Sequence, residues 1–140
     1  MNSIAIVNGP NLNLIGLREP EIYGTKSLND CLQSLAEKYK EQVSLIYYQS
    51  NVEGEIINFL QDCQGKTEGI ILNAGAYTHT SIAIADAVAS IKIPTIEVHI
   101  SNIHAREEFR HHSYLTSRCK GMICGLGLKG YELAIRYFLN

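Results

Sequence analysis

Apolar residues fall into five short runs, and longer segments with helical periodicity lie between them. The runs are rich in Ile and Val and are mostly apolar at successive positions, which is typical of parallel strands buried on both faces. We therefore predict strands at Ile4–Val7, Val43–Gln49, Gly69–Asn73, Thr95–Ile100 and Gly121–Gly125.

The intervening segments repeat apolar residues at the three- and four-residue spacing of amphipathic helices. The first opens with Ser27-Leu-Asn-Asp30, which is close to a capping box. We expect helices at Ser27–Glu41, Glu53–Cys63, His79–Ile91 and Gly127–Leu139. Their predicted apolar residues are Leu28, Leu32, Leu35 and Tyr39, then Ile56, Ile57 and Leu60, then Ile84, Val88 and Ile91, and finally Leu128, Leu133 and Tyr137. The polar segment Arg106–Arg118 is expected to be helical only in part.

Strands that alternate with helices predict an α/β fold with right-handed crossovers. At this length the natural choice is a flavodoxin-like, doubly wound, five-stranded parallel sheet in the order 2-1-3-4-5, flanked by helices. The 140 residues contain no repeat, linker or low-complexity stretch, so we expect one domain over residues 1–140.

Charge and composition exclude several classes of partner. The net charge of −2 gives no electrostatic reason to expect nucleic acid or an anionic membrane. No apolar run reaches the roughly 18 residues of a membrane span, and no basic segment or cleavage site precedes the first strand, so we expect a cytoplasmic protein. The four cysteines are Cys31, Cys63, Cys119 and Cys124. Their spacing is not that of zinc ligands, and we expect them to be small buried hydrophobic residues.

Polar residues follow the first, third and fourth predicted strands. The three ends read Asn8-Gly-Pro-Asn11, Asn73-Ala-Gly-Ala-Tyr-Thr-His79 and Glu97-Val-His-Ile-Ser-Asn102. In this fold the carboxyl ends of those strands meet at the topological switch point, where ligands bind. The sequence therefore predicts a small-molecule pocket at this edge.

The loop after the first strand, Asn8–Gly24, is unusually long and carries Arg18 and Tyr23 together. A guanidinium near a phenol favours the phenolate, so the pKa of Tyr23 would fall from about 10 toward neutrality and the side chain could act as a base. Alternation places Glu97 and His99 on one sheet face, where the carboxylate could orient the imidazole and favour its protonated form.

Each residue also has a purely structural interpretation: Tyr23 could anchor the loop by packing, Arg18 could be a solvated charge, Asn11 a turn residue and His99 a structural histidine. Other classes of the same fold fit less well. The first loop lacks a flavin phosphate loop, Asn73 stands where a receiver domain needs aspartate, and the glycines of Gly125–Gly130 follow the last strand, so they favour close strand–helix packing over dinucleotide binding. A non-enzymatic structural or binding subunit would have no reason to keep Tyr23, Arg18, His99 and Glu97 together.

Six motifs in order resemble the type II 3-dehydroquinate dehydratases. They are NGPNLNLIGLREPEIYG, QSNVEGEII, LNAGAYTHTSIAIADA, EVHISN, REEFRHHS and GLGLKGYELA. The resemblance covers nearly the whole chain. It implies a hydro-lyase that removes water from 3-dehydroquinate to give 3-dehydroshikimate through an enolate, with no metal, no Schiff base and no cofactor. Its setting would be the shikimate pathway, which makes aromatic amino acids, or quinate breakdown.

The same resemblance assigns roles to residues. Tyr23 would be the base, Arg18 essential beside it, Asn11 the group that stabilises the enolate oxygen, His99 the acid and Glu97 its partner. Substrate would contact Asn73, His79, Asp86, Ile100, Ser101 and Arg110. The family often has a second arginine after Arg110, where this chain has His111.

The resemblance further implies a homododecamer built from trimers. On helical spacing His79, Ala83, Asp86 and Ser90 share one face, apart from the apolar stripe. Asp86 would then reach the site of a neighbouring subunit, although the sequence alone favours a solvated surface carboxylate.

Overall fold

Five parallel strands form one sheet in the computed structural model, which describes residues 2–16 and 27–139. The strands are β1 (Asn2–Asn8), β2 (Val43–Gln49), β3 (Gly69–Asn73), β4 (Thr95–His99) and β5 (Gly121–Cys124). Their order is β2-β1-β3-β4-β5, and each adjacent pair is parallel, which confirms the predicted topology.

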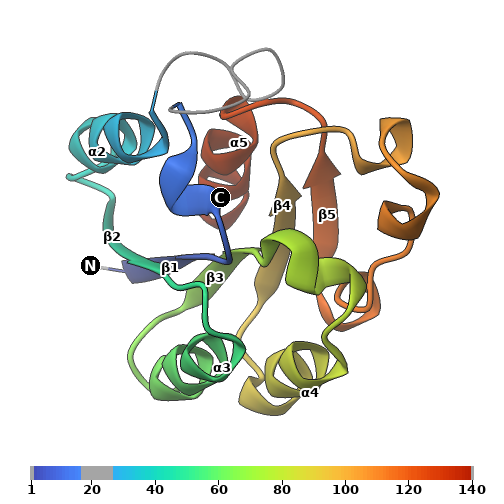
Figure 1. The fold of residues 1–140 in the computed structure, drawn as a ribbon. Helices are drawn as coiled ribbons and strands as arrows, with labels where there is room; N and C mark the ends of the chain where they lie inside the picture. Colours follow the sequence, from blue (N-terminus) through green and yellow to red (C-terminus); the bar gives the residue numbers. More distant parts are fainter. Residues whose placement is uncertain (1, 17–26, 140) are drawn as a thin grey trace.

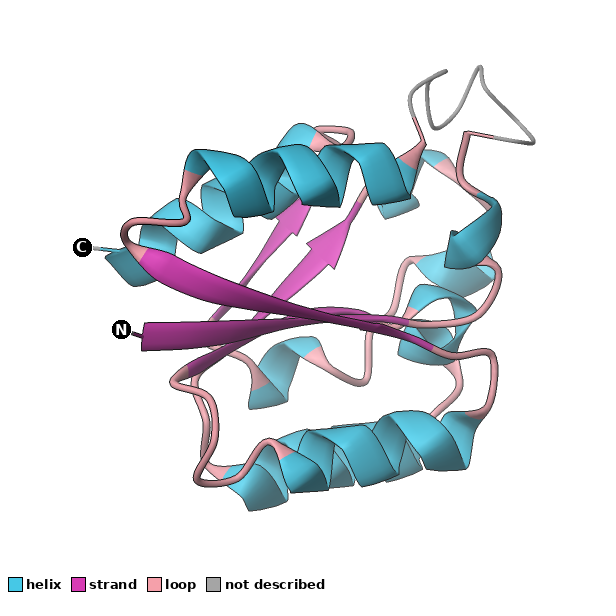
Figure 2. Cartoon of the chain, turned by 90° about the vertical axis from the view of Figure 1, so that its left-hand side faces the viewer, coloured by secondary structure: helices cyan, strands magenta, loops and turns pink. Residues whose placement is uncertain are grey.

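Helices cover both faces of the sheet and give three layers (Figures 1 and 2). Helices α2 (Leu28–Lys38) and α5 (Lys129–Leu139) lie on one face, and α3 (Glu53–Asp62) and α4 (Ile82–Ile91) lie on the other. Successive side chains of a strand point into opposite cores. Ile71 packs with the α2–α5 layer, whereas Ile70 and Leu72 pack with the α3–α4 layer.

Serine side chains cap the N-termini of α2 and α4. The Ser27 hydroxyl accepts the Asp30 N–H at 3.0 Å, as the capping pattern predicted. The Ser81 hydroxyl accepts the Ile84 N–H at 2.9 Å, so α4 begins only at Ile82. The prediction that His79 belongs to this helix is wrong, because His79 ends a separate 3₁₀ turn, Gly75–His79.

The edge strands differ from the interior ones. Every residue of β3 and β4 is buried, as predicted. In β2 Ile46 is 40% and Tyr47 38% exposed, and β5 is half-buried throughout. The prediction of strands buried on both faces is therefore wrong for these two, because an edge strand has a neighbour on one side only.

The buried face of α5 also differs from the prediction. Tyr131, Ala134 and Ile135 are fully buried, whereas Tyr137 is 52% exposed. The helix approaches the sheet at Gly130, where an added Cβ would lie 3.4 Å from Ile123 and Val98. Tyr131, and not Tyr137, therefore lies on the face of α5 that packs on the strands.

Between β4 and β5 the chain makes three short 3₁₀ turns, Ile103–Ala105, Glu108–Arg110 and Thr116–Arg118. Of the cysteines, Cys31 and Cys63 are buried as expected, whereas Cys119 and Cys124 are half-buried. Among the described residues, no helix combines the length and hydropathy needed to cross a bilayer.

Candidate active site

A cavity of about 200 Å³ lies beyond the carboxyl ends of β1, β3 and β4. This is the edge at which the sequence predicts a pocket. Nine of its lining residues come from the three strand ends: Pro10, Asn11, Asn73, Gly75, Ala76, His79, His99, Ile100 and Ser101. The volume and the mixture of amides, imidazoles and a hydroxyl suit one small polar molecule.

Main-chain contacts hold the loops after β1 and β3 together beside this cavity. The Gly9 N–H donates to the Asn73 carbonyl at 2.8 Å. A Cβ at Gly9 would lie 2.3 Å from the Ala74 carbonyl oxygen, so no other residue fits without moving one loop. Asn11 follows in a left-handed conformation with φ of 69°, and its N–H donates to Asn51 Oδ1 at 3.0 Å.

Glu97 and His99 meet through a hydrogen bond of 2.5 Å between His99 Nε2 and Glu97 Oε2. Glu97 is fully buried, and it also accepts the Ser113 hydroxyl at 2.9 Å and the Thr116 hydroxyl at 2.6 Å. Burial alone would raise the pKa of Glu97, but the hydrogen bonds from His99, Thr116 and Ser113 together hold it below its usual value. We refer to Glu97, His99, Ser113 and Thr116 as the carboxylate cluster.

His79 stands opposite His99, with ring centroids 6.2 Å apart. Its Nδ1 lies 2.8 Å from the His112 carbonyl, which can only accept, so Nδ1 carries a hydrogen. Burial lowers the pKa of His79, and the positive charges of His99 and Arg110 lower it further against the opposing effect of the His112 carbonyl. The lowered pKa favours the neutral ring of His79, whose Nε2 can accept a hydrogen bond.

Asn73 is fixed by a buried tyrosine on α5. Its Nδ2 donates to the Tyr131 hydroxyl at 2.9 Å, and that hydroxyl donates to Asn8 Oδ1 at 2.8 Å. Asn73 Oδ1 accepts the Gly75 N–H at 3.1 Å. The sequence analysis missed this support, since Tyr131 lies more than fifty residues from either asparagine. We refer to Asn8, Asn73 and Tyr131 as the amide–phenol cluster.

Two arginines line the cavity, and the sequence analysis selected only one of them. Arg110 Nε donates to Glu107 Oε1 at 2.8 Å, and Arg106 NH1 lies 3.4 Å from the Ser101 hydroxyl. The spacing of four residues between two arginines in a polar segment was the available signal for Arg106. Both guanidinium groups place positive charge where an anionic ligand would lie.

One side of the cavity is apolar, and no sequence motif pointed to it. The residues that form it are Leu12, Leu14, Ile15 and Ile103. Leu12 and Ile15 are nearly buried, which lets the loop after β1 pack onto the α2–α5 core.

Of the predicted site residues that the structure describes, two do not line this cavity: Glu97, which lies behind His99, and Asp86. Asp86 is exposed on α4 and does not line it. Because His79 precedes α4, the predicted helical face shared by His79 and Asp86 is wrong. Arg18 and Tyr23 lie outside the described residues.

The comparison with known families decides the relationship. The family model described as "Dehydroquinase class II" matches residues 2–139. The chain belongs to the class II dehydroquinase family.

Relatives in the class II dehydroquinase family match along essentially the whole chain. A 3-dehydroquinate dehydratase of Bacillus licheniformis is 52% identical, over 100% of this chain and 97% of its own length. One from Photorhabdus laumondii is 49% identical, over 98% of this chain and 92% of its own. The crystal structure of a type II dehydroquinase from Butyrivibrio crossotus superposes with a TM-score of 0.96 at 46% identity, covering 99% of this chain and 98% of that one.

Proposed function

We propose that this chain is a 3-dehydroquinate dehydratase, a hydro-lyase that converts 3-dehydroquinate to 3-dehydroshikimate through an enolate. The single observation that carries the proposal is the match to dehydratases of this name at about half identity over the full chain. The cavity adds chemical support, because it pairs a hydrogen-bonded imidazole with two arginines beside amide groups.

The reaction removes a proton from the carbon next to a ketone and then expels the neighbouring hydroxyl as water. The first step needs a base near the carbon and stabilisation of charge on the oxygen. We assign the base to Tyr23 with Arg18 beside it, following the resemblance. Asn11 is assigned to the enolate oxygen, because an amide is a fixed dipole with no proton to lose.

The second step needs a proton for the departing hydroxyl, and we assign it to His99. His99 is only 5% exposed and lines the cavity, while its Nε2 is held by Glu97. A carboxylate at this nitrogen stabilises the imidazolium, which leaves Nδ1 as the proton donor to a ligand. Glu97 therefore acts through His99 and does not need to touch substrate.

The remaining residues are assigned to substrate binding. Nε2 of His79 accepts a hydrogen bond from a substrate hydroxyl, and Asn73, which Tyr131 holds in place, contacts the substrate ring. Ser101 and the main chain at Ile100 suit the substrate carboxylate, together with the Arg110 guanidinium.

The decisive assay is dehydration of 3-dehydroquinate by the purified protein, followed by the near-ultraviolet absorbance of the enone product. Chelator should leave the rate intact, and borohydride with substrate should not inactivate the enzyme, because no lysine imine forms.

Three variants test the assigned residues. Tyr23→Phe, Arg18→Ala and His99→Ala should each lower turnover by about 10²–10⁴-fold. Tyr137→Phe, on the exposed side of α5, is the matched control and should keep wild-type turnover. Retained turnover in Tyr23→Phe would remove the base assignment, and irreversible borohydride trapping would remove the mechanism.

The proposal extends to a cytoplasmic homododecamer of trimers in which Asp86 reaches the cavity of a neighbouring subunit. The exposed position of Asp86 on α4, outside the cavity of its own subunit, is compatible with a role across a subunit contact. Sedimentation velocity should give about 12 protomers, a number taken from the family resemblance. A fully active monomer would contradict this assembly.

A further inference from the structure

Glu97 is a fully buried carboxylate whose two oxygens both accept hydrogen bonds. Oε2 accepts from His99 and Ser113, and Oε1 accepts from Thr116. Burying a charged group is unfavourable unless hydrogen bonds replace the lost water. The two hydroxyls therefore take the place of solvent around this carboxylate.

The hydrogen of the Ser113 hydroxyl has a defined direction. Its oxygen accepts the N–H groups of Leu115 at 3.0 Å and Thr116 at 3.2 Å, which uses both lone pairs. The one hydroxyl hydrogen is then left for Glu97. Because Ser113 can only donate in this arrangement, it favours the carboxylate over the carboxylic acid.

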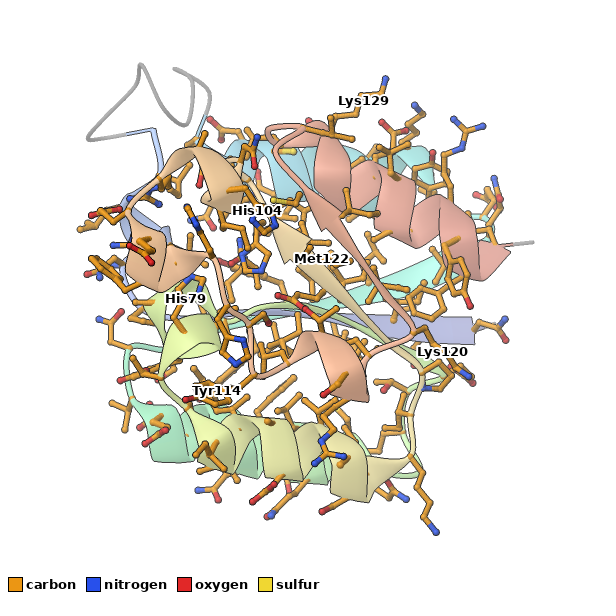
Figure 3. All side chains as sticks on the ribbon, turned by 90° about the vertical axis from the view of Figure 1, so that its right-hand side faces the viewer. His79, His104, Tyr114, Lys120, Met122 and Lys129 are labelled. Atoms are coloured by element: carbon orange, nitrogen blue, oxygen red, sulfur yellow. The ribbon has the colours of Figure 1, made fainter. Side chains whose placement is uncertain are left out.

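The segment that carries these hydroxyls is itself anchored to the cavity. The Tyr114 N–H donates to the Thr78 carbonyl at 3.0 Å, and the His112 carbonyl receives His79 Nδ1. In Figure 3 this segment lies between α5 and α4, with His79 and Met122 marking its neighbours. Thr116 Oγ1 lies 3.9 Å from Met122 Sδ on β5. Ser113 and Thr116 therefore stand between the cavity wall and the edge of the sheet.

We propose that Ser113 and Thr116 are positioning residues that keep Glu97 ionised and oriented, so that His99 retains its proton at the nitrogen that serves the cavity. The proposal deepens the dehydratase function and rests on it. It assigns the two hydroxyls a part in the protonation of the leaving group, although neither residue lines the cavity. The lowered pKa of Glu97, caused in part by these same hydrogen bonds, agrees with the geometry.

Other titratable or charged groups of the described part of the chain surround the pair. They are His79, Arg106, Arg110 and Cys119. Burial raises the pKa of the Cys119 thiol to about 12, with a contribution from Glu97, so the thiol stays neutral. All four remain unchanged in the variants below, so a difference between variants reports the hydroxyls.

The test is Thr116→Val, which keeps the shape of the side chain and removes its hydroxyl. The protonation of the His99 ring is followed by NMR with carbon-13-labelled histidine, and the pH profile of kcat is measured in parallel. Loss of the donor makes the Glu97 carboxylate more basic, so the Glu97–His99 pair holds its proton more tightly and is a weaker acid toward the leaving group. We expect the His99 titration midpoint and the alkaline limb of kcat to move to higher pH by about half to one unit. We expect kcat to fall about tenfold with KM within about twofold of wild type.

Two further variants separate positioning from general damage. Thr116→Ser restores the hydroxyl and should return the His99 titration toward wild type, and Ser117→Ala, exposed in the same 3₁₀ turn, should leave it unchanged. An unmoved His99 titration in both Thr116→Val and Ser113→Ala would overturn the proposal. Should Thr116→Val fail to fold, the same titration on Ser113→Ala decides. Absence of dehydratase activity in the wild type would count against the proposed function instead, because the NMR titration does not depend on turnover.

Discussion

The amide–phenol cluster and the carboxylate cluster lie on opposite faces of the sheet and differ in charge. Asn8 and Asn73 continue the alternation that sends Ile6 and Ile71 toward α5. Glu97 alternates with Ile96 and Val98, so it faces the other side. Both clusters adjoin the cavity, but the carboxylate cluster contains a carboxylate and an imidazole, whereas the amide–phenol cluster contains two amides and a phenol. A neutral network fixes geometry, whereas a charged one can also deliver a proton.

Removing the charge from the carboxylate cluster should have the largest effect. Glu97→Gln replaces a carboxylate that accepts from two hydroxyls and an imidazole with an amide. The amide N–H₂ would then face groups that also donate, and the His99 imidazolium would lose its negatively charged partner. We expect turnover to fall by about 10²-fold or more, measured by steady-state dehydration. Glu132→Gln changes another hydrogen-bonded carboxylate far from the cavity and should leave turnover unchanged. Near wild-type turnover in Glu97→Gln would show that the charge is dispensable.

Breaking the amide–phenol cluster should reduce stability more than chemistry. Tyr131→Phe removes a fully buried hydroxyl that serves both Asn73 and Asn8, so two buried groups lose a partner. We expect the free energy of unfolding to fall by about 2–3 kcal/mol in urea titrations, with a rise in KM as Asn73 loses its support. Tyr39→Phe is the matched control. The Tyr39 hydroxyl donates to Glu132, a half-buried carboxylate that would still have Lys38 and solvent as partners, so this variant should lose less stability. Equal losses in both variants would contradict a special role for Tyr131.

The smallest effect is the pH dependence of these two stability losses. The pKa of Glu97 lies below its usual value of 4.5, so its contribution is complete above pH 4.5 and is lost as the pH falls through the lower folded value. The stability deficit of Glu97→Gln should therefore shrink in acid. The pKa of Tyr131 is raised above 10 by burial, so the deficit of Tyr131→Phe should stay constant from about pH 3 to 8. Urea unfolding across this range tests the contrast, and two deficits with the same pH dependence would remove it.

The sequence was enough to predict the strand order, because local apolar runs and their alternation with helices are visible in it. It also predicted the position of the cavity, since the polar residues Asn73 and His99 stand at the ends of buried strands. It could not supply the partners that hold these residues. Ser113 and Tyr131 are ordinary residues in their own segments, and their hydrogen bonds depend on contacts between distant parts of the chain. The errors on β2 and α5 have the same origin, because burial there is set by neighbouring elements.

The contact between Gly9 and Ala74 limits how the cavity could be redesigned. The two loops touch through main-chain atoms, so no exchange of side chains can bring them closer or add bulk between them. The apolar wall of the cavity is made of side chains, including Leu12, Leu14 and Ile103, and these can be exchanged for smaller ones. An engineered change of substrate size should therefore come from that wall, and a mutant library that varies position 9 would return only damaged proteins.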